Sequence, residues 1–300
     1  MSTAVFNGAW RTISVVSNLH RPKKNDDGTQ FDVTPKSIGW TYLDFNVIKL
    51  EKSRSFEHQS RDREVAIVPL SGSGFVEVGE EKIYLQRSDV FKQSPRVVYI
   101  PPGHLISITA ESSFEFTIGG APAEGRYPIR VFEPNEMKVE VRGGGAARRQ
   151  VNHLLAHPLP AERLILYEAY VPRGAWSGWP PHCHDGSNGS PYLEETYYFR
   201  FDRSDGFGFH RNYKSDTSEN SKSDEHFMVQ DGDLVVIPWG YHLATASPGH
   251  NMWLLNYLAG EPTNDGRAIK PCFDVAHTWI EDDWSKNQMK LPVEMDDTYA

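Results

Sequence analysis

Residues 192–213 read YLEETYYFRFDRSDGFGFHRNY, and this stretch indicates the fold class most clearly. It contains two runs rich in aromatic and β-branched residues, separated by the polar sequence DRSDG at 202–206. Such runs, bounded by Gly, Asp and Ser, predict two antiparallel strands joined by a short turn. Similar runs recur along the chain, as in REVAIVPLSG at 63–72, RVVYIPPGH at 96–104 and DGDLVVIPWGYH at 231–242. We therefore expect an all-β protein with few short helices.

The composition describes a chain that can bury large cores. Of its 300 residues, 39% are hydrophobic and 12% are aromatic, and this length predicts two domains. The 31 Lys and Arg against 40 Asp and Glu give a net charge of −9, which offers no general attraction for nucleic acid or anionic membranes. Two cysteines are too few for a disulfide framework. Because neither a secretion signal nor a membrane-spanning run is visible, we expect a cytoplasmic protein without nucleic-acid or membrane partners.

The stretch RGGGAARRQ at residues 142–150 marks a change in composition. Its three glycines and three arginines are typical of a flexible, charged connection, and we interpret it as a linker rather than a phosphate-binding loop. The predicted domains are therefore residues 1–145 and 146–300. Both would be antiparallel β-barrels of the sandwich or jelly-roll type.

The two halves also share an order of motifs, which predicts an internal duplication. Each half places a histidine and a glutamate on early strands and returns with proline, glycine and a further histidine. In the first half these residues are His58, Glu64 and His104, but Ser60 stands where a second histidine is expected. We interpret the N-terminal site as degenerate, and binding of a second ion there is the open alternative.

Four side chains in the second half are suited to bind a metal ion. They are His182, His184, Glu195 and His242. The two histidines of WPPHCHD (179–185) face the same way on a strand, whereas Cys183 faces the opposite way. The carboxylate opens the next strand, and the third histidine follows a tight turn at 238–240. Three imidazoles and one carboxylate favour a divalent ion such as Zn, Mn or Fe, with Zn expected first. The alternative is that these are satisfied polar residues of the core.

The hairpin predicted at 192–213 suggests further residues beside this site. If Phe201 pairs with Phe207 across the turn, three side chains that can handle a substrate share a face with Glu195. They are Tyr197, Arg211 and Tyr213. Two alternatives stay open: the tyrosines line the barrel core, and the arginine is a structural partner of Glu195 or Asp233.

Together, WPPHCHD, YLEETYYFRF, GFGFHRNY and DGDLVVIPWGYH resemble the 5-deoxy-glucuronate isomerase family of inositol catabolism, which belongs with the uronate ketol-isomerases in the bicupin class. The His-x-His pair, the glutamate and the Pro-x-Gly turn before a histidine look like cupin metal motifs. Ten residues separate His184 from Glu195, more than in typical cupins, and this spacing is similar to that of the subgroup. Three features depart from the family: Leu243 replaces a usual proline, His210 replaces a usual glutamine, and the tail at 260–279 is longer.

The resemblance implies conversion of 5-deoxy-glucuronate, an aldose acid, to 5-dehydro-2-deoxy-gluconate. A proton leaves the carbon beside the aldehyde and returns to the neighbouring carbon through an enediolate, which a divalent ion stabilises as a Lewis acid. We expect Arg211 to hold the substrate carboxylate or a hydroxyl, and Tyr197 and Tyr213 to orient the substrate or carry protons. Asp185 and Glu194 are the candidate bases. A metal-promoted hydride shift, which needs no base, is the alternative.

Other functions are compatible with the same residues. They are isomerisation of another uronate, an iron cupin dioxygenase, and a non-catalytic metal-stabilised sugar-binding cupin. Turnover with zinc or manganese in the absence of oxygen would separate the isomerase from the dioxygenase. The expected partner is a small sugar acid. Because edge strands of such barrels often pair between subunits, a homo-oligomer is also considered.

Overall fold

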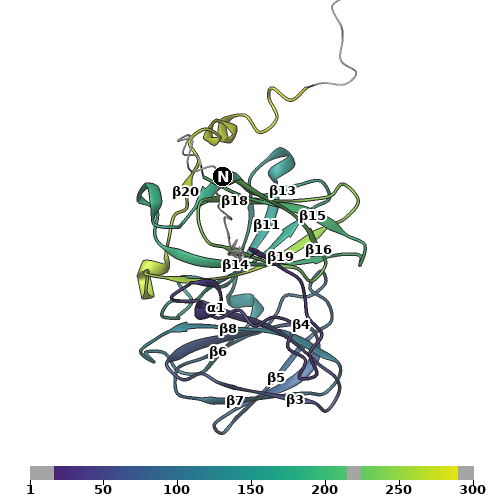
Figure 1. Cartoon of the computed structure of the whole chain (residues 1–300), viewed down its shortest axis with the longest axis vertical. Helices are drawn as coiled ribbons and strands as arrows, with labels where there is room; N and C mark the ends of the chain where they lie inside the picture. Colours follow the sequence, from purple (N-terminus) through teal and green to yellow (C-terminus); the bar gives the residue numbers. More distant parts are fainter. Residues whose placement is uncertain (1–16, 215–223, 290–300) are drawn as a thin grey trace, which may run out of the picture.

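The computed structural model describes residues 17–214 and 224–289, and antiparallel strands make up most of it. Figure 1 shows two barrels stacked end to end, with the N-terminal strands in purple and blue and the C-terminal strands in teal and green. Within the described ranges the α-helical content is one short helix, α1 (Pro35–Ile38), which Thr34 caps at its N-terminus and Gly39 ends in a left-handed conformation. The expected all-β bicupin fold is confirmed.

The N-terminal barrel is built around one long strand. Its strands are β2 (Asp44–Leu50), β3 (Ser55–Gln59), β4 (Arg63–Val78), β5 (Glu81–Arg87), β6 (Val97–Ile100), β7 (Leu105–Ala110), β8 (Phe114–Pro122) and β9 (Arg130–Phe132). One sheet has the order β2-β8-β4-β6-β9, and the far half of β4 pairs with β5 and β7. Valine, isoleucine, leucine and phenylalanine side chains fill the space between these layers.

The C-terminal barrel consists of two sheets. Its strands are β1 (Leu19–His20), β10 (Lys138–Arg142), β11 (Arg149–Leu155), β12 (Ile165–Val171), β13 (Trp176–Cys183), β14 (Leu193–Phe201), β15 (Phe207–Tyr213), β16 (Asp224–Gln230), β17 (Leu234–Ile237), β18 (Tyr241–Ala246), β19 (Met252–Gly260) and β20 (Cys272–Phe273). The strand orders are β1-β17-β14-β19-β12-β11-β10 and β16-β15-β18-β13-β20. Short 3₁₀ turns lie between or after the strands: η1 (Pro134–Glu136), η2 (Gly145–Ala147), η3 (Ser187–Gly189), η4 (Asn264–Arg267) and η5 (Thr278–Asp282).

The predicted duplication is visible in the strand order. The run β2-β8-β4-β6 in the first barrel matches β12-β19-β14-β17 in the second. The registers also agree, because Glu64 on β4 lies opposite Ala121 and Glu194 on β14 lies opposite Ala259. Equivalent positions in the two barrels can therefore be assigned residue by residue.

The two barrels share a buried core. The rings of Phe45 and Tyr257, one from each barrel, pack edge to face with centroids 5.2 Å apart. Arg87 of the first barrel and Glu168 of the second form an ion pair at 2.8 Å that is completely buried. Because a buried charge is costly unless it is paired, this contact requires the two barrels to keep one relative position.

Two sequence expectations about chain organisation were wrong. Residues 142–150 do not link two sheets, since they comprise the end of β10, the turn at 143–148 and the start of β11, and these two strands pair with each other. β1 and β10, which precede residue 146, both belong to a C-terminal sheet. The strands of 192–213 do not form a hairpin either: β14 pairs with β17 and β19, whereas β15 pairs with β16 and β18 in the other sheet.

No helix in the described ranges is long and apolar enough to cross a membrane.

Candidate metal centre

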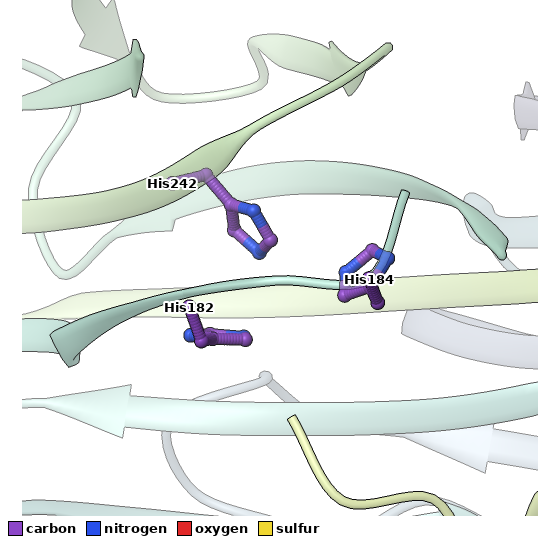
Figure 2. A group of neighbouring side chains, drawn as sticks. All are labelled: His182, His184 and His242. Atoms are coloured by element: carbon purple, nitrogen blue, oxygen red, sulfur yellow. The ribbon is translucent and has the colours of Figure 1, made fainter. Parts of the chain in front are cut away.

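Three histidines meet inside the C-terminal barrel. β13 and β18 lie side by side with His182 opposite His242, and His184 follows the end of β13. Figure 2 shows His242 pointing toward the other two rings from the neighbouring strand. One ligand nitrogen from each ring lies within 4.8 Å of the others. In the part of the chain that the structure describes, this is the only group of His, Cys, Asp or Glu side chains spaced to hold a metal ion.

Glu195 reaches the same point from β14 in the facing sheet. Its Oε2 lies 2.7 Å from Nε2 of His184 and 3.1 Å from Nε2 of His242. These side chains and the barrel wall bury the carboxylate. The four residues predicted from the sequence therefore lie together. His184 and His242 approach the carboxylate oxygen of Glu195, and His182 lies close to the other two histidines.

The donor atoms suit a cation. His184 Nδ1 lies 3.0 Å from the carbonyl oxygen of Leu193, and donation of that N–H leaves the lone pair of Nε2 directed into the site. His242 Nε2 is buried and makes no hydrogen bond of normal geometry. A buried nitrogen without a hydrogen-bond partner is unusual, and a metal ion at this point would satisfy it.

The charges of the centre are also arranged for a metal. Burial opposes ionisation of Glu195, but the charge and hydrogen bond of His184 outweigh it and hold the pKa of the carboxyl well below its usual value. Burial lowers the pKa of His182 far below its usual value, with help from the other two histidines. The carboxylate is thus ionised and this imidazole neutral at neutral pH, which are the forms that bind metals.

A cavity of about 120 Å³ opens beside the cluster. Its polar floor is a row of side chains on adjacent strands: Tyr167 on β12, Asn256 on β19 and Tyr197 on β14 occupy matching register positions. Above them the cavity is bounded by the residues Arg142, Arg149, Val151, Ala169, Ser177, Gly178, His182, His184, Glu195, Leu258, Ile269 and Pro271. A small polar molecule in this cavity would contact the metal-binding side chains directly.

Comparison with known proteins agrees with this geometry. Residues 18–280 match the KduI/IolB family. The chain belongs to the KduI/IolB family. It is 37% identical over 267 residues to the 5-deoxy-glucuronate isomerase of Geobacillus kaustophilus, covering 87% of this chain and 93% of that protein. It is 33% identical over 261 residues to the protein of the same name from Bacillus subtilis strain 168, covering 83% and 91%.

Solved structures place this KduI/IolB protein among the bicupins. A crystal structure of an IolB-like protein from Salmonella typhimurium LT2 matches with a TM-score of 0.81 and 32% identity, covering 88% of this chain and 98% of that one. An oxalate decarboxylase mutant from Bacillus subtilis matches with a TM-score of 0.59 and 13% identity, covering 86% and 80%. The second likeness concerns the fold alone.

In this family member, two of the residues predicted on the hairpin lie outside the barrel. Arg211 pairs with Asp224 on the neighbouring strand, with Nε 2.8 Å from Oδ1 and Nη2 2.7 Å from Oδ2. The Tyr213 hydroxyl donates to Asp274 at 2.7 Å and lies in a cluster with Cys183, on the face of the sheet turned away from the cavity. Neither residue lines the cavity, and the expectation that they share a face with Glu195 was wrong.

The two candidate bases also have structural partners elsewhere. Glu194 points away from the metal site and accepts hydrogen bonds from backbone N–H groups of residues 41–43 in the first barrel. Asp185 accepts from the N–H groups of Gly240, at 2.6 Å, and Ser187, at 3.1 Å. The hydrogen bond from Gly240 to Asp185 holds the turn before His242 against the segment that follows β13 and carries His184. Of the five sequence candidates, only Tyr197 lines the cavity.

The N-terminal barrel has lost the equivalent ligands. His58 lies opposite Ile106, as His182 lies opposite His242, so an isoleucine takes the place of the third histidine. Because Glu64 corresponds to Glu194, the position equivalent to Glu195 is Val65, a core residue. Glu64 and His104 bind backbone groups instead. The three polar residues predicted for this half do not converge.

The sequence singled out His210 as a departure from the family but placed it on the wrong face of its strand, and it missed Asn212; both side chains are buried in the barrel. His210 is 1% exposed; its Nε2 lies 2.7 Å from Asn212 Oδ1, and its ring centroid lies 5.2 Å from that of Tyr197. The alternation of buried and exposed residues along β15 could have shown that His210 and Asn212 face the interior. It was misread because Phe207 and Phe209, on the opposite face, resemble core residues although they are 37% and 50% exposed.

The burial of His210 predicts a pH dependence of stability. Desolvation lowers its pKa to about 3, whereas an unfolded histidine titrates near about 6.5. The unfolded state therefore binds the proton first, and the free energy of unfolding should fall as pH drops from about 6.5 toward 3, by up to about 1.4 kcal/mol per pH unit. Urea unfolding of the wild type and the His210→Gln variant over this range would measure the difference. Equal slopes for the two proteins would contradict the assignment.

Proposed function

We propose that this chain is a metal-dependent aldose–ketose isomerase that converts 5-deoxy-glucuronate to 5-dehydro-2-deoxy-gluconate. One observation carries the proposal: three histidines, two of them buried, and an ionised glutamate meet at the wall of a small polar cavity. Family membership supports the substrate, because curated relatives that cover most of this chain bear the name of this isomerase. The metal and the cavity are what such a reaction needs, since charge develops on two neighbouring oxygens of the sugar acid.

His182, His184, Glu195 and His242 would hold the ion, and zinc is the metal we expect first, with manganese and iron as alternatives. A divalent ion bound there supplies Lewis-acid stabilisation of negative charge on substrate oxygens. Three of these residues, His182, His184 and Glu195, also line the cavity. A substrate in the cavity would therefore lie beside an ion that they held.

Tyr197 is the side chain best placed to donate a hydrogen bond to the substrate. It lies on the strand of Glu195, two residues further on, and lines the cavity. Burial and the neighbouring Glu195 charge raise its pKa well above the usual value, so its hydroxyl stays protonated and acts as a donor. Asn256 and Tyr167 stand beside it in the floor of the cavity and can orient the sugar hydroxyls.

The deciding experiment follows 5-deoxy-glucuronate by NMR with zinc-loaded protein under anaerobic conditions. We expect the ketose product to accumulate with the wild type, and the rate to fall by roughly 10²- to 10³-fold in His182→Ala, as when one stabilising group for developing charge is removed. Turnover without oxygen would exclude the dioxygenase. Absence of a ketose, or equal turnover by His182→Ala, would end the proposal.

The proposal assigns different tasks to the two predicted domains. The C-terminal barrel carries the chemistry, and the N-terminal barrel, whose interior is apolar, supports it through the shared core. The cytoplasmic location and the homo-oligomer considered from the sequence stay predictions.

A further inference from the structure

Arg149 is a cation in the cavity wall that pairs with no acidic side chain in the described part of the chain. It begins β11, and its neighbour on the same face of the strand, Val151, is part of the core inside the barrel. In the described ranges its hydrogen bond is to the carbonyl oxygen of Ala147, at 3.2 Å, and it forms no ion pair with an acidic residue there. Burial lowers its pKa to about 10, so the guanidinium is charged at neutral pH but poorly solvated.

Arg142 is a neighbouring arginine whose contacts can be compared with those of Arg149. Arg142 lies directly opposite Arg149 in the β10–β11 register and also borders the cavity. Its Nε donates to Glu140 at 2.6 Å, so its charge is balanced. Two like charges placed opposite each other destabilise a strand pair. Because Arg142 pairs with Glu140, which Lys138 shares, Arg149 is the member of this pair that forms no ion pair with the described residues.

The position of Arg149 relative to the metal cluster indicates what that counter-ion is. Along the sheet β14, β19, β12 and β11 are successive neighbours, so Glu195 and Arg149 stand at opposite sides of one cavity with the polar floor between them. Val151, two residues from Arg149, aligns with Phe199 on β14, so Arg149 is also displaced from Glu195 along the strands, and both residues line the cavity. The positive charge of Arg149 acts to lower the pKa of Tyr197 and of His182. The guanidinium therefore lies within electrostatic range of the metal centre.

We propose that Arg149 binds the carboxylate of the substrate and thereby selects sugar acids over neutral sugars. A guanidinium matches a carboxylate with two parallel hydrogen bonds, and the free donors of Arg149 are available for them. The carboxylate end of the substrate then lies at β11, and its aldehyde end lies at the histidine cluster. This assignment rests on the proposed function for the identity of the substrate, and it replaces Arg211 as the anchoring residue.

The kinetic test compares one acid and its neutral counterpart. Arg149→Met should lower kcat/KM for 5-deoxy-glucuronate by about 10- to 100-fold, the loss expected for a hydrogen-bonded charge pair, mainly through KM. Activity on 5-deoxy-glucose, which has a hydroxymethyl group in place of the carboxylate, should change less than threefold, and Arg149→Lys should recover part of the loss. Arg203→Met is the matched control, because Arg203 is exposed and pairs with Asp205. Equal losses on both sugars, or a loss in Arg211→Met instead, would overturn the assignment.

A binding measurement separates this inference from the proposed function. Calorimetry with D-gluconate, a stable sugar acid, and with D-sorbitol, its neutral counterpart, needs no turnover. We expect gluconate to bind the wild type at least about 10-fold more tightly than Arg149→Met, and sorbitol to bind both equally. If gluconate binding depends on Arg149 while the wild type fails to isomerise 5-deoxy-glucuronate, the reaction is wrong and the anchor stands. If isomerisation occurs but binding is the same in both proteins, the anchor is wrong.

Discussion

Replacing Glu195 with glutamine is expected to remove the metal and the activity together while the barrel stays folded. The carboxylate is the one acidic side chain among the four proposed ligands, so its charge offsets much of the cost of holding a divalent ion in a buried site. Glutamine preserves the shape and the buried volume but supplies no charge. We expect metal content to fall from about one ion per chain to well below one, and isomerisation to slow by roughly 10²- to 10³-fold.

Elemental analysis after mild purification measures the first effect, and the NMR assay measures the second. Glu194→Gln is a matched control, because it changes the same residue type one position away on the same strand, where the side chain points to the other barrel. This control should retain the metal. A Glu195→Gln protein with a full complement of zinc would show that the carboxylate is not a ligand.

The four predicted ligand residues lie together for a local reason. His182 and His184 share a face because strand side chains alternate, and this rule needs no knowledge of the partner strand. The turn that delivers His242 is marked by its own proline and glycine. For the same reason the strands and the all-β class could be predicted, since each run carries its turn signals with it.

The failures all concern pairing between distant segments. The sequence at 202–206 is a turn, but the strands on either side enter different sheets, and the exposed aromatic side chains of Phe207 and Phe209 gave the wrong face the appearance of a core. Arg149 was assigned to a linker because its neighbours are glycines and arginines. Its place in the cavity wall depends on β11 pairing with β12 and β12 with β19, which no local pattern encodes.

Glu194 leads to the second prediction, a large loss of stability without loss of the metal. Its side chain is 1% exposed, and its two oxygens accept from the backbone N–H groups of Thr41, at 2.7 Å, and of Tyr42 and Leu43, both at 2.8 Å. Glutamine keeps one acceptor oxygen and turns an NH₂ group toward donors that then lose their partner. We expect the free energy of unfolding to fall by about 3 kcal/mol, since a hydrogen-bonded charge is lost and a buried donor is left unsatisfied.

The duplicated fold provides an internal check on this effect. Glu64, the equivalent residue of the first barrel, accepts from the N–H groups of residues 162–164 in the second, so Glu64→Gln should destabilise the protein by a similar amount. Urea unfolding followed by fluorescence measures both variants, with zinc content as the parallel readout. If Glu194→Gln unfolds like the wild type yet loses turnover, the residue is the catalytic base considered from the sequence. Loss of stability with retained zinc identifies it instead as a residue that holds the two barrels together, because its side chain accepts hydrogen bonds from the backbone of residues 41–43 and from the Tyr192 hydroxyl.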